Sequence, residues 1–215
     1  MKVKRGEAAY ERDSVLFDEI QNNWPLLAGL FRAANENEGK LCVLDFGGSL
    51  GSVFYQNKEF LESLKSIQWC IVEQVNFVDL GKIYFEDERL KFYKTIDECL
   101  KKHNPNVLLL SSVIPYLEKP YEWIMKFSNL KIPYIIVDRT PFIEMERDIL
   151  TIQKVPESIY KASYPAWFFN LNKIEKQFVN YDLLGVFDSF VGGEMVLNNL
   201  YKCSWKGLLL KLKTN

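Results

Sequence analysis

Short runs of apolar residues recur through the middle of the chain, separated by longer segments in which apolar and polar positions mix. A continuous apolar run of this kind is typical of a strand that is buried on both faces, as in a parallel sheet. Such runs predict strands at 41–46, 69–74, 90–94, 106–112 and 133–138.

The segments between these runs carry apolar residues at the spacing of one helix face. One of them begins with Thr95 and Glu98 at the spacing of a capping box. Strands that alternate with helices indicate βαβ units, and hence an α/β fold with a mostly parallel sheet and helices on both faces. Helices are predicted at 52–66, 76–85, 95–102 and 120–130.

The beginning of the chain departs from this alternation and predicts an N-terminal helical extension. One helix would carry Leu16 and Phe17 on its apolar side, with Asp13 or Ser14 as its cap. A second helix would begin near Pro25, because proline suits the first helical turn.

The end of the chain also departs from the alternation of strands and helices. After Asp138 the alternation stops for about forty residues and resumes with two apolar runs, which predict a terminal strand pair. The length of 215 residues fits a single domain. Its predicted parts are the N-terminal helices (1–39), a cofactor-binding half (40–138), an insertion or acceptor lid (139–180) and the terminal strand pair (181–215).

Composition and charge narrow the classes of partner. Hydrophobic residues make up 48% of the chain and charged residues 26%, as in an ordinary globular protein. The formal net charge of −1 gives no electrostatic reason to expect nucleic acid or an anionic membrane as a partner. No apolar run approaches the roughly 18 residues of a membrane span, and the first residues lack the core of a signal peptide. We therefore expect a cytoplasmic protein with a small-molecule partner; the pattern does not indicate an oligomeric state.

The cysteines are scattered along the sequence. None belongs to a CxxC pair or has a histidine at metal-ligand spacing, and Cys42 and Cys70 lie in apolar runs. A thiol in such a run acts as a small core residue. The sequence therefore predicts no metal site and a reducing compartment.

A glycine-rich stretch, VLDFGGSLGS at 43–52, follows the first predicted strand and opens the next helix. In an open parallel sheet, ligands bind at the carboxyl ends of the strands, near the switch in strand order. Glycines permit positive φ and a close approach of ligand to backbone, and the helix amino terminus adds N–H donors. The alternative is a tight turn that is rich in glycine for packing reasons alone.

Two cofactor motifs can be compared with this stretch. The dinucleotide fingerprint G-x-G-x-x-G/A is met strictly only at Gly47, since Ser49 and Ser52 stand at its other two positions. The pattern D/E-x-G-x-G-x-G, which methyltransferases use, is met at Asp45, Gly47 and Gly51 and departs only at Ser49. The second pattern fits better.

Polar side chains end two further predicted strands. Glu73 ends the second strand, where a carboxylate can accept hydrogen bonds from both ribose hydroxyls of a nucleoside, or can simply face solvent. Ser111 and Ser112 end the fourth strand at the same edge, close to where a transferable methyl group would lie. They can equally serve as a cap of that strand.

Longer motifs cover most of the chain from about residue 4 to residue 170. They are KRGEAAYERDSVLFDEI, LDFGGSLGS, WCIVEQ, LLLSSVIPYLEKPYEWI, IIVDRTPF and QKVPESIYKASYPAWFFN. In these motifs the chain resembles class I S-adenosylmethionine-dependent methyltransferases. More narrowly, it resembles a methyltransferase family encountered among bacterial surface-polysaccharide genes.

The resemblance implies a Rossmann-like fold with seven strands, the last one antiparallel, and S-adenosylmethionine as cofactor. It implies that Asp45 orders the loop, that the glycines line the methionine moiety, and that Glu73 holds the ribose. For the acid that often meets the adenine, only Asp97 is at hand, inside a helix start. The candidate cofactor-binding residues are Asp45, Gly47, Gly48, Ser49, Gly51, Glu73, Gln74, Ser111 and Ser112.

Candidates for the acceptor site follow the fifth predicted strand. Methyl transfer is an in-line displacement that depends on positioning, and it needs a base only where the acceptor loses a proton. The motif DRTPF at 138–142 ends this strand at the ligand edge or forms a local turn, and the aromatic run at 159–169 offers faces for a sugar or buries the insertion. His103 precedes the fourth strand, at the opposite edge, and is not expected to be catalytic. The candidates are Asp138 or Tyr164 as base, and Arg139, Thr140, Tyr160 and Trp167 for acceptor binding.

These features predict a methyltransferase whose acceptor is a small hydroxylated molecule such as a sugar or sugar nucleotide. Two alternatives stay open. One is a binding module that keeps this fold but transfers nothing, because no base is evident. The other is an NAD-dependent oxidoreductase, because such enzymes share the glycine loop and the acid after the second strand.

Overall fold

The structure is a computed structural model that describes residues 3–5, 7–12, 15–157, 161–190 and 193–214. The chain folds into two compact units, residues 1–110 and 111–215. Both units combine strands and helices, and the fold is mixed α/β with a parallel-dominated central sheet. In the part of the chain that is described, no helix combines the length and the apolar character needed to cross a membrane.

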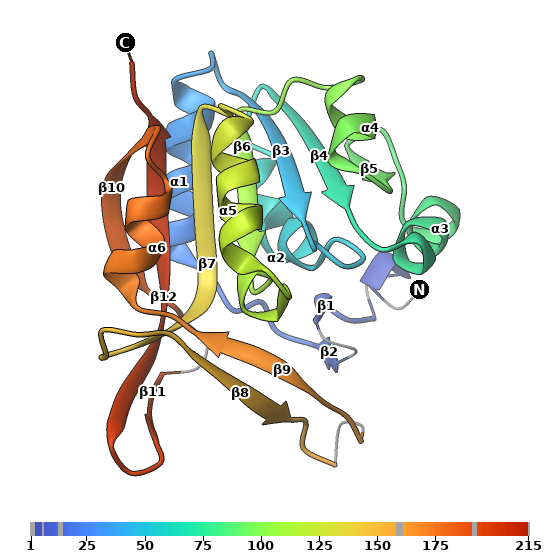
Figure 1. The fold of residues 1–215 in the computed structure, drawn as a ribbon. Coiled ribbons are helices and arrows are strands. Elements are labelled where there is room, and N and C mark those ends of the chain that lie inside the picture. Colours follow the sequence, from blue (N-terminus) through green and yellow to red (C-terminus); the bar gives the residue numbers. More distant parts are fainter. Residues whose placement is uncertain (1–2, 6, 13–14, 158–160, 191–192, 215) are drawn as a thin grey trace. The chain divides into compact units, whose positions relative to one another are not determined.

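The first unit contains four parallel strands in the order β6-β3-β4-β5 (Figure 1). The order places β3, the earliest of the four in the chain, between β4 on one side and β6 on the other. This is the switch point of an open α/β sheet. The strands, close to the predicted runs, are β3 (Lys40–Phe46), β4 (Ser66–Val72), β5 (Leu90–Tyr93) and β6 (Val107–Ser111).

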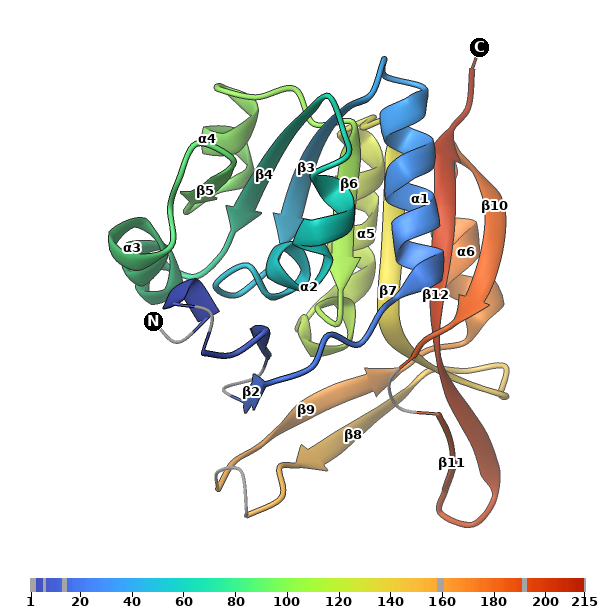
Figure 2. The same cartoon turned by 180° about the vertical axis from the view of Figure 1, so that it is seen from behind.

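Helices cover both faces of these strands, as predicted. On one face, α2 (Ser52–Leu61) packs Phe54 against Trp69 of β4, with ring centroids 5.8 Å apart. Figure 2 shows α2 in front of β3 and β6. On the opposite face, α4 (Ile96–Leu100) brings Cys99 into hydrogen-bonding contact with Cys70 of β4.

The helix α3 (Val75–Tyr84) returns the chain from β4 to β5. Its Gly81 lies so close to the Phe92 ring of β5 that a Cβ at this position would overlap the ring. The Oγ1 of Thr95 accepts a hydrogen bond from the Glu98 N–H at 3.1 Å, which confirms the expected cap of α4.

The N-terminal expectation is half wrong. Instead of a first helix, two short strands form an antiparallel pair, β1 (Tyr10–Arg12) and β2 (Val15–Phe17), after a turn of 3-10 helix at Val3–Arg5. The register pairs Tyr10 with Phe17, and their rings stack at 4.7 Å. Tyr10 is fully buried in this cross-strand stack, whereas Leu16 is left exposed. The expected caps, Asp13 and Ser14, lie outside the described residues.

The second N-terminal helix is confirmed as α1 (Trp24–Asn35), with Pro25 in its first turn. The side chain of Asn23 caps it by accepting a hydrogen bond from the Leu26 N–H at 3.3 Å. At its other end, the Asn106 side chain donates to the Ala33 carbonyl at 3.0 Å. The same side chain accepts from the backbone N–H of Cys42 at 2.7 Å, which ties α1 to β3.

The second unit contains the predicted terminal strand pair, with an additional strand beside it that was not predicted. In it, β12 (Tyr201–Leu212) runs antiparallel between β10 (Tyr181–Asp188) and β7 (Tyr134–Ile143). The additional β11 (Glu194–Leu197) pairs with the beginning of β12, so the expected count of seven strands is not confirmed. The helical elements are 3-10 helix η2 (Ile114–Tyr116), α5 (Pro120–Asn129) and α6 (Leu171–Gln177).

The strand β7 does not end at Asp138, as the sequence suggested, but continues to Ile143. A β-bulge interrupts it: Leu208 pairs with Val137 and Lys206 with Thr140, so one residue of β12, Gly207, faces two of β7. The bulge gives Arg139 a φ of 49°. The apolar run ended in the sequence at the bulge, which is why the prediction stopped there.

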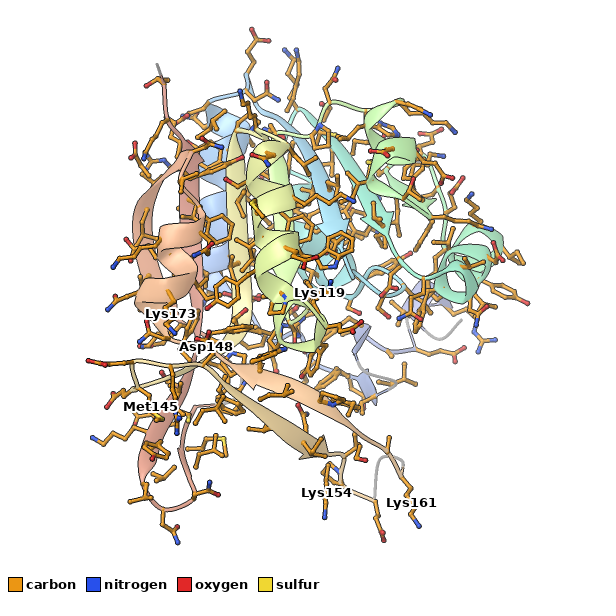
Figure 3. The ribbon with its side chains drawn as sticks, viewed as in Figure 1. Lys119, Met145, Asp148, Lys154, Lys161 and Lys173 are labelled. Carbon is orange, nitrogen blue, oxygen red and sulfur yellow. The ribbon has the colours of Figure 1, made fainter. Side chains whose placement is uncertain are left out.

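The insertion after β7 forms a hairpin of β8 (Ile149–Lys154) and β9 (Ser163–Phe168). Figure 3 labels Asp148 near the base of this hairpin and Lys154 and Lys161 near its far end. The Asp148 carboxylate accepts hydrogen bonds from the Tyr121 hydroxyl at 2.6 Å and from the Asn170 N–H at 2.7 Å. These bonds anchor the hairpin base to α5 and to the start of α6.

Candidate functional site

The glycine-rich loop at 47–51 connects the carboxyl end of β3 to α2, at the switch point of the first unit. Three of its residues have positive φ: Gly47 at 74°, Ser49 at 53° and Gly51 at 97°. The Gly47 N–H donates to the Val72 carbonyl at 2.9 Å, and the Gly51 N–H donates to the Gly48 carbonyl at 3.0 Å. The backbone therefore makes a tight turn whose shape depends on glycine or on a small polar residue.

Asp45 lies directly beneath this loop and is 1% exposed. Its Oδ2 accepts a hydrogen bond from the indole Nε1 of Trp69 at 2.9 Å. A Cβ at Gly48 would lie 2.5 Å from the Asp45 Cγ, so the loop backbone rests on the carboxylate. The geometry makes Asp45 a support of the loop.

The amino end of α2 follows immediately. Gly51 occupies the N-cap position and supplies no capping side chain, so the first N–H groups of α2 have no side-chain acceptor there. Uncapped donors at a helix amino terminus favour an anionic group such as a carboxylate.

Glu73 follows β4, the strand next to β3, as the sequence predicted. It is half-buried, and its Oε2 accepts a hydrogen bond from the Gln74 N–H at 2.6 Å. Gln74 is exposed and stands at the N-cap of α3. Asp97 is exposed in the first turn of α4. A carboxylate has several lone pairs, so Glu73 can keep its backbone bond and still accept from a ligand hydroxyl.

The second unit gathers another set of the predicted residues. The Ser111 hydroxyl donates to Asp138 Oδ2 at 2.9 Å and accepts from Arg139 Nε at 3.1 Å. The Arg139 Nε also lies 3.6 Å from Asp138 Oδ2. The Ser112 N–H donates to the Asp138 carbonyl at 2.9 Å, and the buried Thr140 hydroxyl donates to the same oxygen at 3.4 Å. Asp138 is thus a buried carboxylate held by an ion pair and a hydroxyl, at the bulge of β7.

The aromatic run divides as expected between burial and exposure. Phe168 and Phe169 are buried, whereas Tyr164 and Trp167 on β9 are half-buried. Trp167 stacks on Phe169 with centroids 6.3 Å apart. Tyr160 lies outside the described residues.

Tyr116 joins this cluster and was missed by the sequence analysis. Its ring meets the Tyr164 ring edge to face at 5.4 Å, and its hydroxyl donates to Gln153 Oε1 at 3.2 Å. Its position was the available signal, because Tyr116 belongs to the short segment that follows β6, at the ligand edge of that strand.

Solved structures similar to this chain are numerous. The N-terminal domain of EvdMO1, crystallised in the presence of SAH and D-fucose, matches with a TM-score of 0.52 and 10% identity, over 99% of this chain and 95% of that chain. A S-adenosylmethionine-dependent methyltransferase from Clostridium acetobutylicum ATCC 824 matches with a TM-score of 0.55 and 11% identity, over 90% and 93%. A pericyclic reaction enzyme matches with a TM-score of 0.56 and 10% identity, over 91% of this chain and 49% of that chain. No family model and no curated protein matches the sequence.

The similarity defines the class of fold. The chain has the Rossmann-like fold of class I S-adenosylmethionine-dependent methyltransferases. At identities near 10% the likeness establishes this fold and no particular activity.

Proposed function

We propose that the protein is a S-adenosylmethionine-dependent methyltransferase whose acceptor is a small hydroxylated molecule, a sugar or sugar nucleotide of the kind used in surface polysaccharides. The observation that carries the proposal is the loop at 47–51. It combines three residues of positive φ with an uncapped helix amino terminus at the switch point of the first unit. In open α/β sheets, ligands bind at such a switch point.

The cofactor would be held by the first unit. The loop residues Gly47, Gly48, Ser49 and Gly51 would line the methionine moiety, whose carboxylate suits the N–H donors of α2. Glu73 would accept hydrogen bonds from the ribose hydroxyls, with Gln74 beside it. When bound, the cofactor supplies the methyl group that the acceptor receives.

The acceptor would be held by residues of the second unit. Half-buried Tyr164 and Trp167 offer aromatic faces, and Arg139 and Thr140 offer polar groups. A sugar acceptor is supported by EvdMO1, which was crystallised with D-fucose present. When the methyl group leaves the sulfonium for an acceptor oxygen, the hydroxyl proton must pass to a base. Asp138 and Tyr164 are the two candidates for that base, and Ser111 and Ser112 would lie beside the transferred group.

The first test is a thermal-shift titration of the full chain with S-adenosylmethionine, S-adenosylhomocysteine and NAD. A ligand at a hundredfold its dissociation constant stabilises a fold by about 2.7 kcal/mol, which raises Tm by roughly 5–10 °C at this size. We expect this shift with the first two ligands and none with NAD. A shift with NAD alone would replace the proposal with the oxidoreductase alternative.

A matched pair of variants locates the binding site. Glu73→Gln removes the charge that strengthens the ribose hydrogen bonds, so we expect affinity for S-adenosylhomocysteine to fall by about 10-fold or more. Glu59→Gln changes an exposed carboxylate on α2 and should leave the affinity unchanged. Equal effects of the two substitutions would show that Glu73 does not contact the ribose.

The acceptor is tested by measuring S-adenosylhomocysteine release with a panel of sugars and sugar nucleotides. Turnover with one of them would identify the acceptor class, and Asp138→Asn and Tyr164→Phe would then separate the two candidate bases by their effect on kcat. Cofactor binding without turnover on any acceptor would favour the non-transferring module. The ion pair of Asp138 with Arg139 is the observation that keeps this second candidate, because it occupies the carboxylate.

A further inference from the structure

A second cluster of reactive side chains lies in the first unit, away from the loop at 47–51. One ligand atom each from Cys42, Cys70 and His103, two thiol sulfurs and a ring nitrogen, lie within 4.8 Å of one another. In tetrahedral zinc sites the metal binds sulfur at about 2.3 Å and nitrogen at about 2.0–2.1 Å, which places ligand atoms about 3.4–3.8 Å apart. A bound ion would therefore need to draw these atoms together by at most about 1.0–1.4 Å.

The sheet register, rather than the sequence spacing, brings the cysteines together. Leu44 of β3 pairs with Cys70 of β4, so Cys42 and Cys70 stand diagonally on the same face of neighbouring parallel strands. The helix α4 covers this face beside β4 and β5 (Figure 1). His103 follows α4, and its backbone N–H donates to the Cys99 carbonyl at 2.9 Å.

Cys99 is the candidate for a fourth ligand, although its sulfur lies outside the set of atoms within 4.8 Å of one another and would have to move further. It is fully buried on α4, and its thiol is a hydrogen-bonding partner of Cys70. We propose that Cys42, Cys70, Cys99 and His103 form a site for one thiophilic metal ion, Zn²⁺, that joins β3, β4 and α4. Three thiolates and a neutral imidazole make up the Cys₃His set of structural zinc sites.

The surroundings suit such a site. The Nε2 of His103 lies 2.7 Å from the Tyr93 hydroxyl, and metal-binding histidines generally use their second nitrogen for such an outer hydrogen bond. Three thiolates with one Zn²⁺ carry a net charge of −1. Lys91 and Lys102, both close enough to act on the charge of His103, offset it.

A cavity lies on the side of His103. It has a volume of about 850 Å³ and is lined by His103 and Tyr93 together with charged side chains of α3, β5 and the segment after α4. Cys42 is only partly buried, unlike Cys70 and Cys99. Among the proposed ligands, His103 is the one that lines this cavity.

The test uses the full chain, reduced and freed of metal with a chelator, and then titrated with Co²⁺ and Zn²⁺. We expect one ion per chain, visible Co²⁺ bands with tetrahedral intensity, a sulfur-to-cobalt charge-transfer band in the near ultraviolet, and displacement of Co²⁺ by Zn²⁺. Zn²⁺ should also raise Tm, because it binds the folded chain. Absence of the charge-transfer band, or binding below one ion per chain, would overturn the proposal.

Variants separate a built site from adventitious thiol binding. His103→Gln and Cys42→Ser should each weaken Co²⁺ binding by more than about 100-fold, beyond what loss of an outer hydrogen bond costs, whereas Tyr93→Phe should weaken it by about 10–100-fold. Cys203→Ser removes a buried cysteine of the second unit and should change nothing. Each variant is first compared with the parent chain by circular dichroism. The proposal fails if folded Cys42→Ser and Cys203→Ser behave alike, or if oxidation links Cys42 to Cys70 while Zn²⁺ does not bind.

Discussion

Replacing Gly51 with alanine tests whether the turn into α2 needs a positive φ and close packing at this position. Gly51 has a φ of 97°, and an L-residue in the left-handed region costs roughly 1–2 kcal/mol. Its new Cβ would also lie 3.2 Å from Leu90 Cδ2, a tight contact that costs up to about 1 kcal/mol. The reduced entropy of the unfolded chain returns about 0.4–1 kcal/mol. We therefore expect Gly51→Ala to destabilise the protein by about 1–2 kcal/mol, or about 2–8 °C in Tm.

Two other glycines separate the contributions. Gly193 has a φ of 57° but no atom within 4 Å of its ideal Cβ, so Gly193→Ala carries the backbone cost without the contact. Gly185 in β10 has an open environment and no positive φ, so Gly185→Ala should be neutral or stabilising by up to about 1 kcal/mol. Thermal and urea unfolding followed by circular dichroism measure all three. If Gly51→Ala is no more harmful than Gly193→Ala, the close packing assigned to the loop is wrong.

Three further changes have expected outcomes. Ser111→Ala removes the hydroxyl that donates to Asp138 and should lower the free energy of unfolding by about 1–3 kcal/mol, measured in urea. Asn106→Ala leaves backbone groups of α1 and β3 without partners and should cost about 2–4 kcal/mol; a loss below about 1 kcal/mol would contradict the tie between them. Burial, reinforced by Asp87, raises the pKa of Tyr55 to about 12, above the roughly 10 of an unfolded chain, so its contribution is complete below pH 10 and is lost as pH rises toward 12. Tyr55→Phe should therefore flatten the fall in stability between pH 10 and 12.

The parallel strands and the glycine loop could be predicted because their signals are local. An apolar run such as 41–46 is a strand in any α/β fold, and a loop of glycines after it has few other uses. The positive φ values of Gly47 and Gly51 follow from the same reasoning. The positive φ of Ser49 does not, because serine adopts this conformation only when its surroundings require it.

The N-terminal hairpin could not be predicted from local pattern. Leu16 and Phe17 fit one face of a helix as well as they fit a strand, and the segment is too short for periodicity to decide. The pairing of Phe17 with Tyr10 in the two strands decides between them, and this contact joins residues seven positions apart. A contact between two strands cannot be read from the apolar pattern of either segment alone, even when the segments are this close in the sequence.

The bulge in β7 shows the same limit at a candidate site. Nothing in DRTPF says that the strand continues, because Arg139 interrupts the apolar run. Gly207, far along the chain, makes the bulge possible: a Cβ there would lie 2.7 Å from the Val137 carbonyl oxygen. The orientation of Asp138 and Arg139 toward Ser111 is thus specified by a glycine on another strand, which no motif around 138–142 includes.

The cluster of Cys42, Cys70, Cys99 and His103 joins residues that lie far apart in the sequence. Metal motifs are found in sequences by ligands a few residues apart, because such ligands share one turn or one loop. Cys42 and Cys70 share no such segment; they meet because parallel strands set in register place every second residue on a common face. Cys99 and His103 stand four residues apart around the end of α4, a ligand spacing that the sequence analysis did not recognise. Only the packing of α4 against the sheet brings this pair to Cys70. In a parallel sheet, cysteines that are far apart in the sequence can therefore form a metal site when their side chains lie on the same face of neighbouring strands. The Co²⁺ titration decides whether these four residues bind a metal as one site.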